Sequence, residues 1–266
     1  MITCYLLGGL GNQLFLIFTV INVSLKRRIP FVLPNTPRID DRPFYFDSFL
    51  SKLKKNTIDF EINHFRKCTE EKMFEYQIIS KYSKDFCLYG YFQNAKYFDE
   101  NKNKILEIIG FEEQVNIVKT KFPYNFDCSL HFRIGDAKQN IGFVILDISY
   151  YINALKLLNP STVLYFYEEE DTTFINEQMS LLKKEFPEIQ FTPIDTSIQD
   201  YEQMILMSLC KNNIIANSTF SWWGAYLNTN QDKKVFYPSK YFQNYNIHLE
   251  KDVFKLFLDS WIRVNC

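Results

Sequence analysis

The strongest constraint on the fold is a regular alternation of strand-like and helix-like segments between residues 128 and 240. Short apolar runs bounded by turn residues predict strands, and longer runs with one apolar face predict helices. Strands joined by helices through short connections form parallel βαβ units, so this part of the chain predicts a doubly wound α/β sheet. The predicted strands are Cys128–Phe132, Val163–Tyr167, Ile189–Thr192, Ile214–Ala216 and Val235–Tyr237, and the predicted helices are Tyr150–Leu158, Thr173–Phe186, Gln199–Lys211 and Phe220–Leu227.

The first 125 residues are less regular. They begin with a predicted strand, Ile2–Leu7, a glycine-rich turn and a helix, Asn12–Lys26, and a short strand is predicted over Phe31–Leu33. We therefore expect an N-terminal domain over residues 1–125 and a second domain over residues 126–245, with a linker within Lys119–Asp127. Residues 246–266 are predicted to form a C-terminal helix, over Asp252–Arg263, that could pack back on the N-terminal domain.

Composition excludes several classes of protein. The formal net charge of −1 argues against nucleic acid or an anionic membrane as a partner bound through bulk charge. The six cysteines are scattered without a CxxC pair, which argues against a zinc site and favours reduced thiols in the cytoplasm. The apolar stretch Leu14–Val23 is too short to span a bilayer, and Met1–Leu7 lacks the basic start of a signal peptide. We expect no transmembrane segment.

The segment Ile215–Gly224 joins a predicted strand to a predicted helix. Its apolar start is followed by Asn217, Ser218 and Thr219, residues that cap helix N-termini. Helix N-termini bind anions through their N–H groups and dipole, so the segment predicts a phosphate cradle. A capped helix without a ligand is the alternative interpretation.

A second turn, Gly8-Gly9-Leu10-Gly11-Asn12-Gln13, also lies between a predicted strand and a predicted helix. It lacks the Lys-Ser/Thr of a Walker A loop and the glycine spacing of a dinucleotide fingerprint. The carboxamides of Asn12 and Gln13 could hydrogen-bond a sugar or a phosphate. A role confined to the turn and the helix start remains open.

The third motif, His131-Phe132-Arg133-Ile134-Gly135-Asp136, ends a predicted strand. Strand alternation places His131 and Arg133 on one face and Phe132 and Ile134 on the other. An arginine there can bind a diphosphate through paired hydrogen bonds and neutralise charge on a leaving group. An Arg133–Asp136 ion pair that closes a turn is the alternative.

All three motifs follow strands, and open α/β sheets bind ligands at the carboxyl ends of their strands. Together they suit a nucleotide diphosphate without a metal, because no DxD motif stands beside a strand. The acidic run Glu168–Asp171 also follows a strand, and a solvated loop and helix start is its simplest interpretation.

These motifs, together with Leu14-Phe15 and Val235–Phe242, resemble the α-1,2-fucosyltransferase family, glycosyltransferase family 11. The resemblance covers residues 1–30 and 127–243 well and the rest loosely. It implies an α/β fold of the GT-B kind, with two Rossmann-like domains facing across a cleft. The N-terminal domain would lie on the acceptor side, and the second would bind the GDP-sugar.

The resemblance also implies the reaction. The family transfers L-fucose from GDP-fucose to a glycan hydroxyl, here expected to be the 2-OH of a galactoside, with inversion and without a metal or other cofactor. Arg133 would bind the pyrophosphate and stabilise departing GDP, with Asp136 and Asn12 as further catalytic residues. The expected donor-binding residues are Gly9, Gly11, Gln13, His131, Asp200, Asn217, Ser218, Thr219, Phe220 and Ser221.

Two departures from the family pattern leave alternatives open. Many members carry a second arginine where this chain has Ile134, and Ser-Asp-Asp where it has Tyr167–Asp171. A different GDP-deoxyhexose donor, a non-catalytic sugar-binding protein and a nucleotide-binding regulator are the alternative functions. A base for the acceptor hydroxyl could be Asp40, Asp41, His64 or Asp136, which sequence spacing does not rank.

Overall fold

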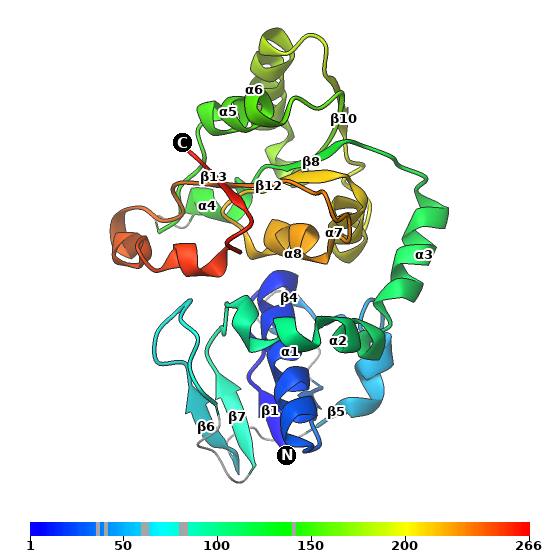
Figure 1. Ribbon diagram of the computed structural model, residues 1–266, viewed down its shortest axis with the longest axis vertical. Helices are drawn as coiled ribbons and strands as arrows, with labels where there is room; N and C mark the ends of the chain where they lie inside the picture. Colours follow the sequence, from blue (N-terminus) through cyan, green and yellow to red (C-terminus); the bar gives the residue numbers. More distant parts are fainter. Residues whose placement is uncertain (36–37, 40–41, 60–63, 80–84, 140–141) are drawn as a thin grey trace. The chain divides into compact units, whose positions relative to one another are not determined.

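The computed structural model describes residues 1–35, 38–39, 42–59, 64–79, 85–139 and 142–266. The chain forms two compact units (Figure 1). Unit 1 comprises Met1–Ile117 and Asp252–Leu256, and unit 2 comprises Val118–Lys251 and Phe257–Cys266. Both units have the α/β character that the sequence predicts, and the larger sheet of each is parallel.

Unit 2 contains a six-stranded parallel sheet with the strand order β10-β9-β8-β11-β12-β13. Numbered from the first strand of the unit, this is the order 3-2-1-4-5-6 of a doubly wound sheet. The prediction for residues 128–240 is therefore confirmed. The strands are β8 (Cys128–His131), β9 (Thr162–Phe166), β10 (Gln190–Pro193), β11 (Asn212–Ile214), β12 (Val235–Pro238) and β13 (Ile262–Val264).

Helices pack on this sheet through its alternating side chains. Residues 128, 130, 132 and 134 belong to one apolar core, which also contains Tyr150 and Tyr151 of α5 and Met179 of α6. The opposite set includes Ser129, whose hydroxyl accepts a hydrogen bond from Asn213 of β11 at 2.7 Å. Besides the short α4 (Gly135–Gln139), the helices of the unit are α5 (Ile148–Leu158), α6 (Thr172–Glu185), α7 (Asp200–Leu209) and α8 (Thr219–Leu227).

Helix α8 is buried through most of its length. Trp222 and Trp223 are fully buried, and the Trp222 ring stacks on Tyr226 with centroids 4.8 Å apart. A Cβ atom on Gly224 would lie 2.7 Å from Cβ of Met207, so α7 and α8 approach closely at that glycine. The paired tryptophans therefore belong to the core of unit 2.

Unit 1 is built on shorter strands. The sheet order is β1-β7-β6, all parallel, from Ile2–Cys4, Phe86–Tyr89 and Arg66–Thr69. The two-residue strands β2 (Leu33–Pro34) and β5 (Thr57–Ile58) pair in parallel, and β3 (Arg38–Ile39) and β4 (Arg42–Pro43) pair antiparallel. The predicted strand at Phe31–Leu33 is reduced to a bridge at Phe31 and the start of β2.

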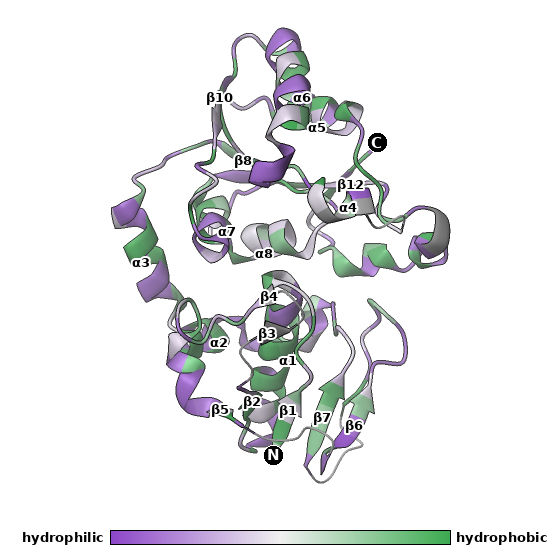
Figure 2. Cartoon of the chain, turned by 180° about the vertical axis from the view of Figure 1, so that it is seen from behind, coloured by the Kyte–Doolittle hydropathy of each residue, from purple (hydrophilic) through white to green (hydrophobic). Residues whose placement is uncertain are grey.

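Helix α1 (Leu10–Arg27) lies in the core of unit 1. Every residue from Leu10 to Val23 is buried except Asn12, and Figure 2 shows its apolar colouring. Asn22 is buried in the same helix and donates to Tyr97 O at 2.5 Å. The predicted helix Asn12–Lys26 is confirmed. Within the described ranges no helix combines the length and apolarity needed to cross a membrane. Two further helices, α2 (Lys102–Ile109) and α3 (Phe111–Lys121), were not predicted, and α3 occupies the start of the expected linker.

The prediction of a C-terminal helix over Asp252–Arg263 is wrong. Residues 253–256 form a single 3₁₀ turn, and Ile262–Val264 form β13, which pairs in parallel with β12. The apolar residues from Val253 to Trp261 are spaced as in an amphipathic helix. The β-branched Ile262 and Val264 that follow instead form the edge strand of the sheet.

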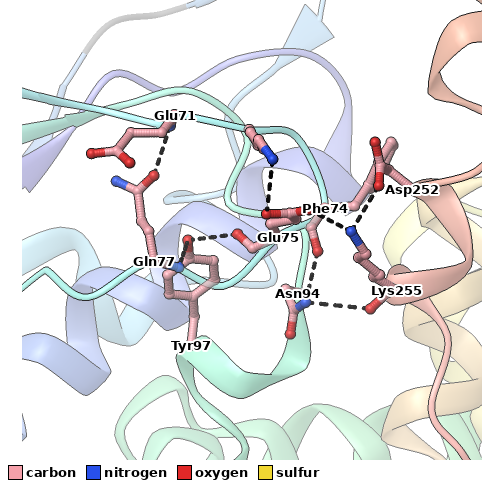
Figure 3. Close-up of polar contacts among 9 residues, drawn as sticks. Glu71, Phe74, Glu75, Gln77, Asn94, Tyr97, Asp252 and Lys255 are labelled. Carbon is pink, nitrogen blue, oxygen red and sulfur yellow. Dashed lines mark hydrogen bonds and ion pairs between the residues drawn. The ribbon is translucent and has the colours of Figure 1, made fainter.

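Residues Asp252–Leu256 pack within unit 1 (Figure 3). The Lys255 ammonium contacts the carboxylates of Glu75 and Asp252, and Asn94 Nδ2 donates to Phe74 O at 2.7 Å and to Lys255 O at 3.3 Å. Val253 and Leu256 bury their side chains. Short 3₁₀ turns elsewhere span Ser51–Asn56, Ala95–Tyr97, Asp99–Asn101, Glu169–Asp171 and Asn244–Leu249.

Candidate active site at the carboxyl ends of β8 and β11

The strand order defines where unit 2 can bind a ligand. β8 and β11 are neighbours, but the chain continues from β8 toward β9 and from β11 toward β12, on opposite sides. Such a switch point leaves a crevice at the carboxyl ends of the two strands. His131 ends β8, Phe132–Gly135 follows it, and Asn217–Phe220 follows β11, so two of the predicted motifs meet there.

Arg133 is the charged group at this switch point. Its Nη1 donates a hydrogen bond of 2.5 Å to the backbone oxygen of Asn217. Its Cζ lies 4.1 Å from the centroid of the Phe143 ring, within the range of a cation–π contact. Phe132 and Ile134 are buried in the core on the other side, as strand alternation predicts. Arg133 is thus a partly exposed residue whose guanidinium is held in place from two sides.

Asn217 supports the loops around Arg133. Its side chain is fully buried, and Nδ2 donates to Val144 O at 2.8 Å and to Tyr241 O at 3.1 Å. Both amide hydrogens therefore reach backbone carbonyls. The Asn217 side chain thus joins three chain segments, and its predicted contact with phosphate or sugar stays a prediction.

The segment before α5 is joined to the segment after β12. Phe143 and Phe242 form an antiparallel bridge, and their ring centroids are 5.3 Å apart. Gln243 strengthens the junction, because its Nε2 donates to Phe143 O at 3.0 Å and its backbone N–H donates to Gly142 O at 3.0 Å. The bridge and the two hydrogen bonds of Gln243 therefore fix the backbone of Phe143, whose ring contacts Arg133.

Tyr150 of α5 supports the β11 loop from the core. Its hydroxyl donates to Ile215 O at 2.5 Å and lies 3.1 Å from Phe236 O. Burial raises the pKa of Tyr150 well above its ordinary value, so the hydroxyl keeps its proton and remains a donor.

The start of α8 shows which polar residues serve the helix itself. Ser218 is the N-cap, and its hydroxyl accepts from the Phe220 N–H at 3.2 Å. Ser221 is buried, and its hydroxyl accepts from Ala216 N at 3.2 Å. Thr219 and Phe220 are partly exposed, and the Phe220 ring lies 5.7 Å from the buried His131 ring. The predicted cap at the start of α8 is therefore confirmed, and the first turn that follows it is partly exposed.

Asp171 is a site residue that sequence reasoning missed. Glu168, Glu169 and Glu170 are exposed, but Asp171 is only 2% exposed. Its carboxylate accepts hydrogen bonds from Gly135 N at 2.8 Å and from the Lys138 ammonium. The last residue of the acidic run therefore fixes the turn that follows Arg133. Its distance from that turn in the sequence hid this role.

Asp200 is placed away from these contacts. It is exposed in the first turn of α7, and its Oδ1 accepts from the Tyr201 N–H at 2.7 Å. The neighbouring Glu202 is buried and pairs with Lys121 at 2.9 Å. The expected contact of Asp200 with the donor remains a prediction.

The predicted residues of the glycine-rich turn lie in unit 1. Gln13 is 1% exposed, and its Nε2 donates to Gly8 O and to Pro43 O, both at 3.0 Å. Asn12 Oδ1 accepts from Gln93 Nε2 at 2.9 Å. Gly9 is the N-cap of α1, and Gly11 is buried in its first turn. The carboxamides thus hold the turn to β4 and to the segment after β7.

Gln93 belongs to a strained turn after β7. Gly90 has φ +144 and Phe92 has φ 52. The Glu70 carboxylate holds this turn by accepting from Tyr91 N at 2.8 Å and from Phe92 N at 3.0 Å, and burial raises its pKa despite these bonds.

The candidate bases are only partly described. Asp40 and Asp41 lie outside the described residues, and so does the side chain of Asp136. His64 is exposed just before β6. Among the residues that the structure describes, no group of three or more His, Cys, Asp or Glu side chains is placed to hold a metal ion. The cysteines are all free thiols.

Comparison with known families identifies the chain. The family model of glycosyl transferase family 11 matches residues 1–265. The chain belongs to glycosyl transferase family 11. The resemblance carried by the three motifs is therefore confirmed, and the family covers the loosely matching residues as well. A family 11 glycosyltransferase uses a sugar donor and a glycan acceptor.

Two characterised relatives of this family 11 chain come from Escherichia coli. WbnK, an O-antigen biosynthesis glycosyltransferase, is 33% identical over 198 residues, which are 67% of this chain and 61% of WbnK. The match thus spans less than two thirds of that relative. An α-1,2-colitosyltransferase is 25% identical over 289 aligned positions, with 97% of both chains covered.

Among solved structures, the family 11 chain is similar to the ADP-heptose lipopolysaccharide heptosyltransferase II of E. coli. The TM-score is 0.47 at 12% identity, covering 90% of this chain and 84% of that one. A likeness of this strength adds nothing to the sheet order described above.

Proposed function

We propose that this family 11 enzyme transfers L-fucose from GDP-fucose to the 2-hydroxyl of a galactoside in a glycan, with inversion and without a metal ion. The observation that carries the proposal is Arg133, held at the switch point by Asn217 O and the Phe143 ring. A partly exposed arginine with a fixed guanidinium beside a helix N-terminus suits the diphosphate of a nucleotide sugar.

The proposed chemistry needs charge stabilisation at one side of the sugar. The bond between fucose C1 and the β-phosphate oxygen breaks, and the acceptor oxygen forms a new bond to C1 on the opposite face. Negative charge grows on the leaving GDP, where Arg133 neutralises it. The acceptor hydroxyl gives up its proton to a base, for which Asp136 and His64 stay candidates together with Asp40 and Asp41.

Support for the linkage comes from a relative. The colitosyltransferase is named for an α-1,2 linkage, and it covers nearly the whole chain. We extend the linkage position to this enzyme as part of the proposal. WbnK is named for O-antigen biosynthesis, so a bacterial surface oligosaccharide is the first acceptor class to test.

The colitosyltransferase motivates a second candidate function. In it, the donor is another GDP-deoxyhexose, and the enzyme transfers, for example, a colitosyl group. Ile134, which replaces a second arginine of many members, is 3% exposed and lies in the core away from Arg133. Loss of that arginine therefore leaves the Arg133 side of the strand unchanged, and we place GDP-fucose first.

The test is GDP release and product formation from GDP-fucose with a panel of β-galactosides, in the presence of EDTA. Arg133→Ala is compared with Arg263→Ala, since Arg263 lies on the edge strand β13 with two strands between it and β8. We expect acceptor-dependent release in EDTA, a loss of roughly 10²- to 10³-fold in kcat for Arg133→Ala, and little change for Arg263→Ala.

Other outcomes decide between the alternatives. Turnover with GDP-colitose but not with GDP-fucose would establish the second candidate. Tight GDP binding that needs Arg133, with no transfer from any donor, would favour the non-catalytic sugar- or nucleotide-binding protein. Activity lost in EDTA and restored by a divalent cation would contradict metal independence. The cytoplasmic location is likewise a proposal, which fractionation of the native host would test.

A further inference from the structure

Phe143 lies against the one arginine that the proposed reaction depends on. The Arg133 Cζ is 4.1 Å from the centroid of the ring. A guanidinium is planar and carries its N–H donors in that plane, so a ring against one face leaves the donors directed outward past the ring edge. The ring thus constrains the plane in which Arg133 can form paired hydrogen bonds.

We propose that Phe143 is a positioning residue of the transfer reaction, because its ring holds the Arg133 guanidinium in the plane that receives the diphosphate of the donor. The inference rests on the proposed function, since it takes a GDP-sugar as the ligand of Arg133. It assigns a role in donor binding to a residue outside the three sequence motifs.

The ring is itself held firmly. The antiparallel bridge between Phe143 and Phe242 fixes the backbone, and Gln243 Nε2 binds Phe143 O at 3.0 Å. Tyr241 packs edge-on at 6.2 Å and Phe242 lies at 5.3 Å. Glu250 anchors the supporting segment, accepting from Tyr241 N at 2.9 Å and from Phe242 N at 2.6 Å. A ring with these supports can impose an orientation on a flexible arginine.

Asn217 couples the two supports of Arg133. Its backbone oxygen accepts from Nη1, while its side chain donates to Val144 O, the carbonyl next to Phe143. A displacement of the ring therefore also strains the hydrogen bond that holds the guanidinium. Because these contacts form on folding, Arg133 is oriented before a ligand arrives, and less ordering is needed when it binds.

The test compares Phe143→Leu with Phe143→Tyr. Leucine keeps an apolar side chain but removes the aromatic face, whereas tyrosine keeps the face. GDP affinity is measured by titration calorimetry, together with kcat and KM for GDP-fucose. We expect Phe143→Leu to weaken GDP binding by roughly 3- to 30-fold, the range of a cation–π contact, and Phe143→Tyr to stay within about 2-fold of the parent.

A purely structural role would behave differently. Phe191→Leu removes a partly buried ring on β10 that packs against the core of unit 2. It serves as the matched control, and its GDP affinity should change far less than that of Phe143→Leu. A double-mutant cycle with Arg133→Lys adds the decisive readout. If Phe143 acts through the guanidinium plane, Phe143→Leu should have almost no further effect on GDP affinity once lysine replaces Arg133.

The outcomes separate this inference from the proposed function. Equal losses in Phe143→Leu and Phe191→Leu, or additive effects in the cycle, would overturn the positioning role while leaving the transferase intact. GDP binding that depends on both residues, without fucose transfer, would support the positioning role and reject GDP-fucose as the donor. An Arg133→Ala variant that binds GDP as the parent does would overturn both.

Discussion

The buried carboxylate of Asp171 accepts a hydrogen bond from the backbone N–H of Gly135, with Oδ2 2.8 Å from the nitrogen. The same carboxylate binds the Lys138 ammonium. One acidic side chain from the start of α6 therefore closes the turn after β8, which carries Arg133.

Asp171→Ala should destabilise the protein by about 1–3 kcal/mol, because the partly buried Gly135 N–H and the Lys138 ammonium both lose their acceptor. The free energy of unfolding is measured by urea denaturation. Glu170→Ala, at the exposed neighbouring position, is the control and should change stability by less than about 0.5 kcal/mol. Equal effects of the two substitutions would show that Asp171 does not hold the turn.

The glycine-rich turn offers a matched pair of substitutions. Gly8 has φ +65, and a Cβ atom there would also lie 2.4 Å from Asn12 Nδ2, whereas Gly9 has φ −73 and no neighbouring heavy atom within 4 Å of such a Cβ. Gly8→Ala should cost about 1–2 kcal/mol through the left-handed backbone. Gly9→Ala should stay within about 0.5 kcal/mol. Thermal unfolding of both variants measures the difference, and a larger loss for Gly9→Ala would contradict the backbone geometry.

The contact between Lys255 and Glu75 predicts a pH dependence of stability. The Lys255 ammonium lowers the pKa of the Glu75 carboxyl in the folded state. A lowered pKa stabilises the fold above the ordinary pKa of the carboxyl, and this contribution disappears as pH falls through the folded pKa. Lys255 has a raised pKa, caused by its hydrogen bonds to Asp252 and then to Glu75, so its contribution is lost only at strongly alkaline pH.

Lys255→Met should therefore lower the Tm near neutral pH, and the difference from the parent should shrink as the solution is made more acidic than the ordinary pKa of a glutamate. The effect is small, because the pair is exposed. The exposed neighbour Lys251 provides the control, since a Lys251→Met variant should show a Tm difference with little dependence on acid pH. A Lys255→Met difference that persists in acid would contradict the role of the Glu75 charge.

The thiols should differ sharply in reactivity. Burial raises the pKa of Cys87 and of Cys210 to about 12, and raises those of Cys4 and Cys128 well above the ordinary value. The thiolate is the reactive form, and burial also blocks access. Iodoacetamide at mildly alkaline pH should therefore modify the partly exposed Cys266 first in the folded protein. Peptide mass spectrometry locates the label.

Unfolding in urea should make all six cysteines react, and a Cys266→Ser variant should lose the early labelling. Rapid labelling of Cys87 in the folded protein would contradict its burial in unit 1.

Local patterns predicted those elements of unit 2 whose own residues carry strand alternation or a helix cap. The alternation of residues along the predicted strand, continued past the end of β8, correctly placed Ile134 in the core and Arg133 on the other side. The cap at Ser218 was also visible, because a cap and its helix are adjacent in sequence. Within unit 1, α1 was evident from its apolar length, whereas two-residue strands such as β2 leave almost no pattern.

Long-range contacts explain what sequence reasoning missed. The contacts of the Asn217 amide were not predicted, because Val144 and Tyr241 are 73 and 24 positions away in the sequence. Its contact with a ligand stays a prediction. Asp171 looked like one member of an exposed acidic run, and only the fold buries it against Gly135. β13 was read as helix, since three residues at a sheet edge carry too few side chains to outweigh a longer apolar pattern.

The return of Asp252–Leu256 to unit 1 has a consequence for dividing this protein into fragments. Neither unit is one continuous piece of chain, so no single cut yields both units whole. An expressed fragment 1–117 would lack Val253 and Leu256 and would expose the apolar surface that they cover. A fragment beginning at residue 118 would in turn carry an unpartnered turn between β12 and β13. Separate production of unit 1 therefore calls for a fused copy of residues 252–256, much as a split protein is restored by its complementing peptide.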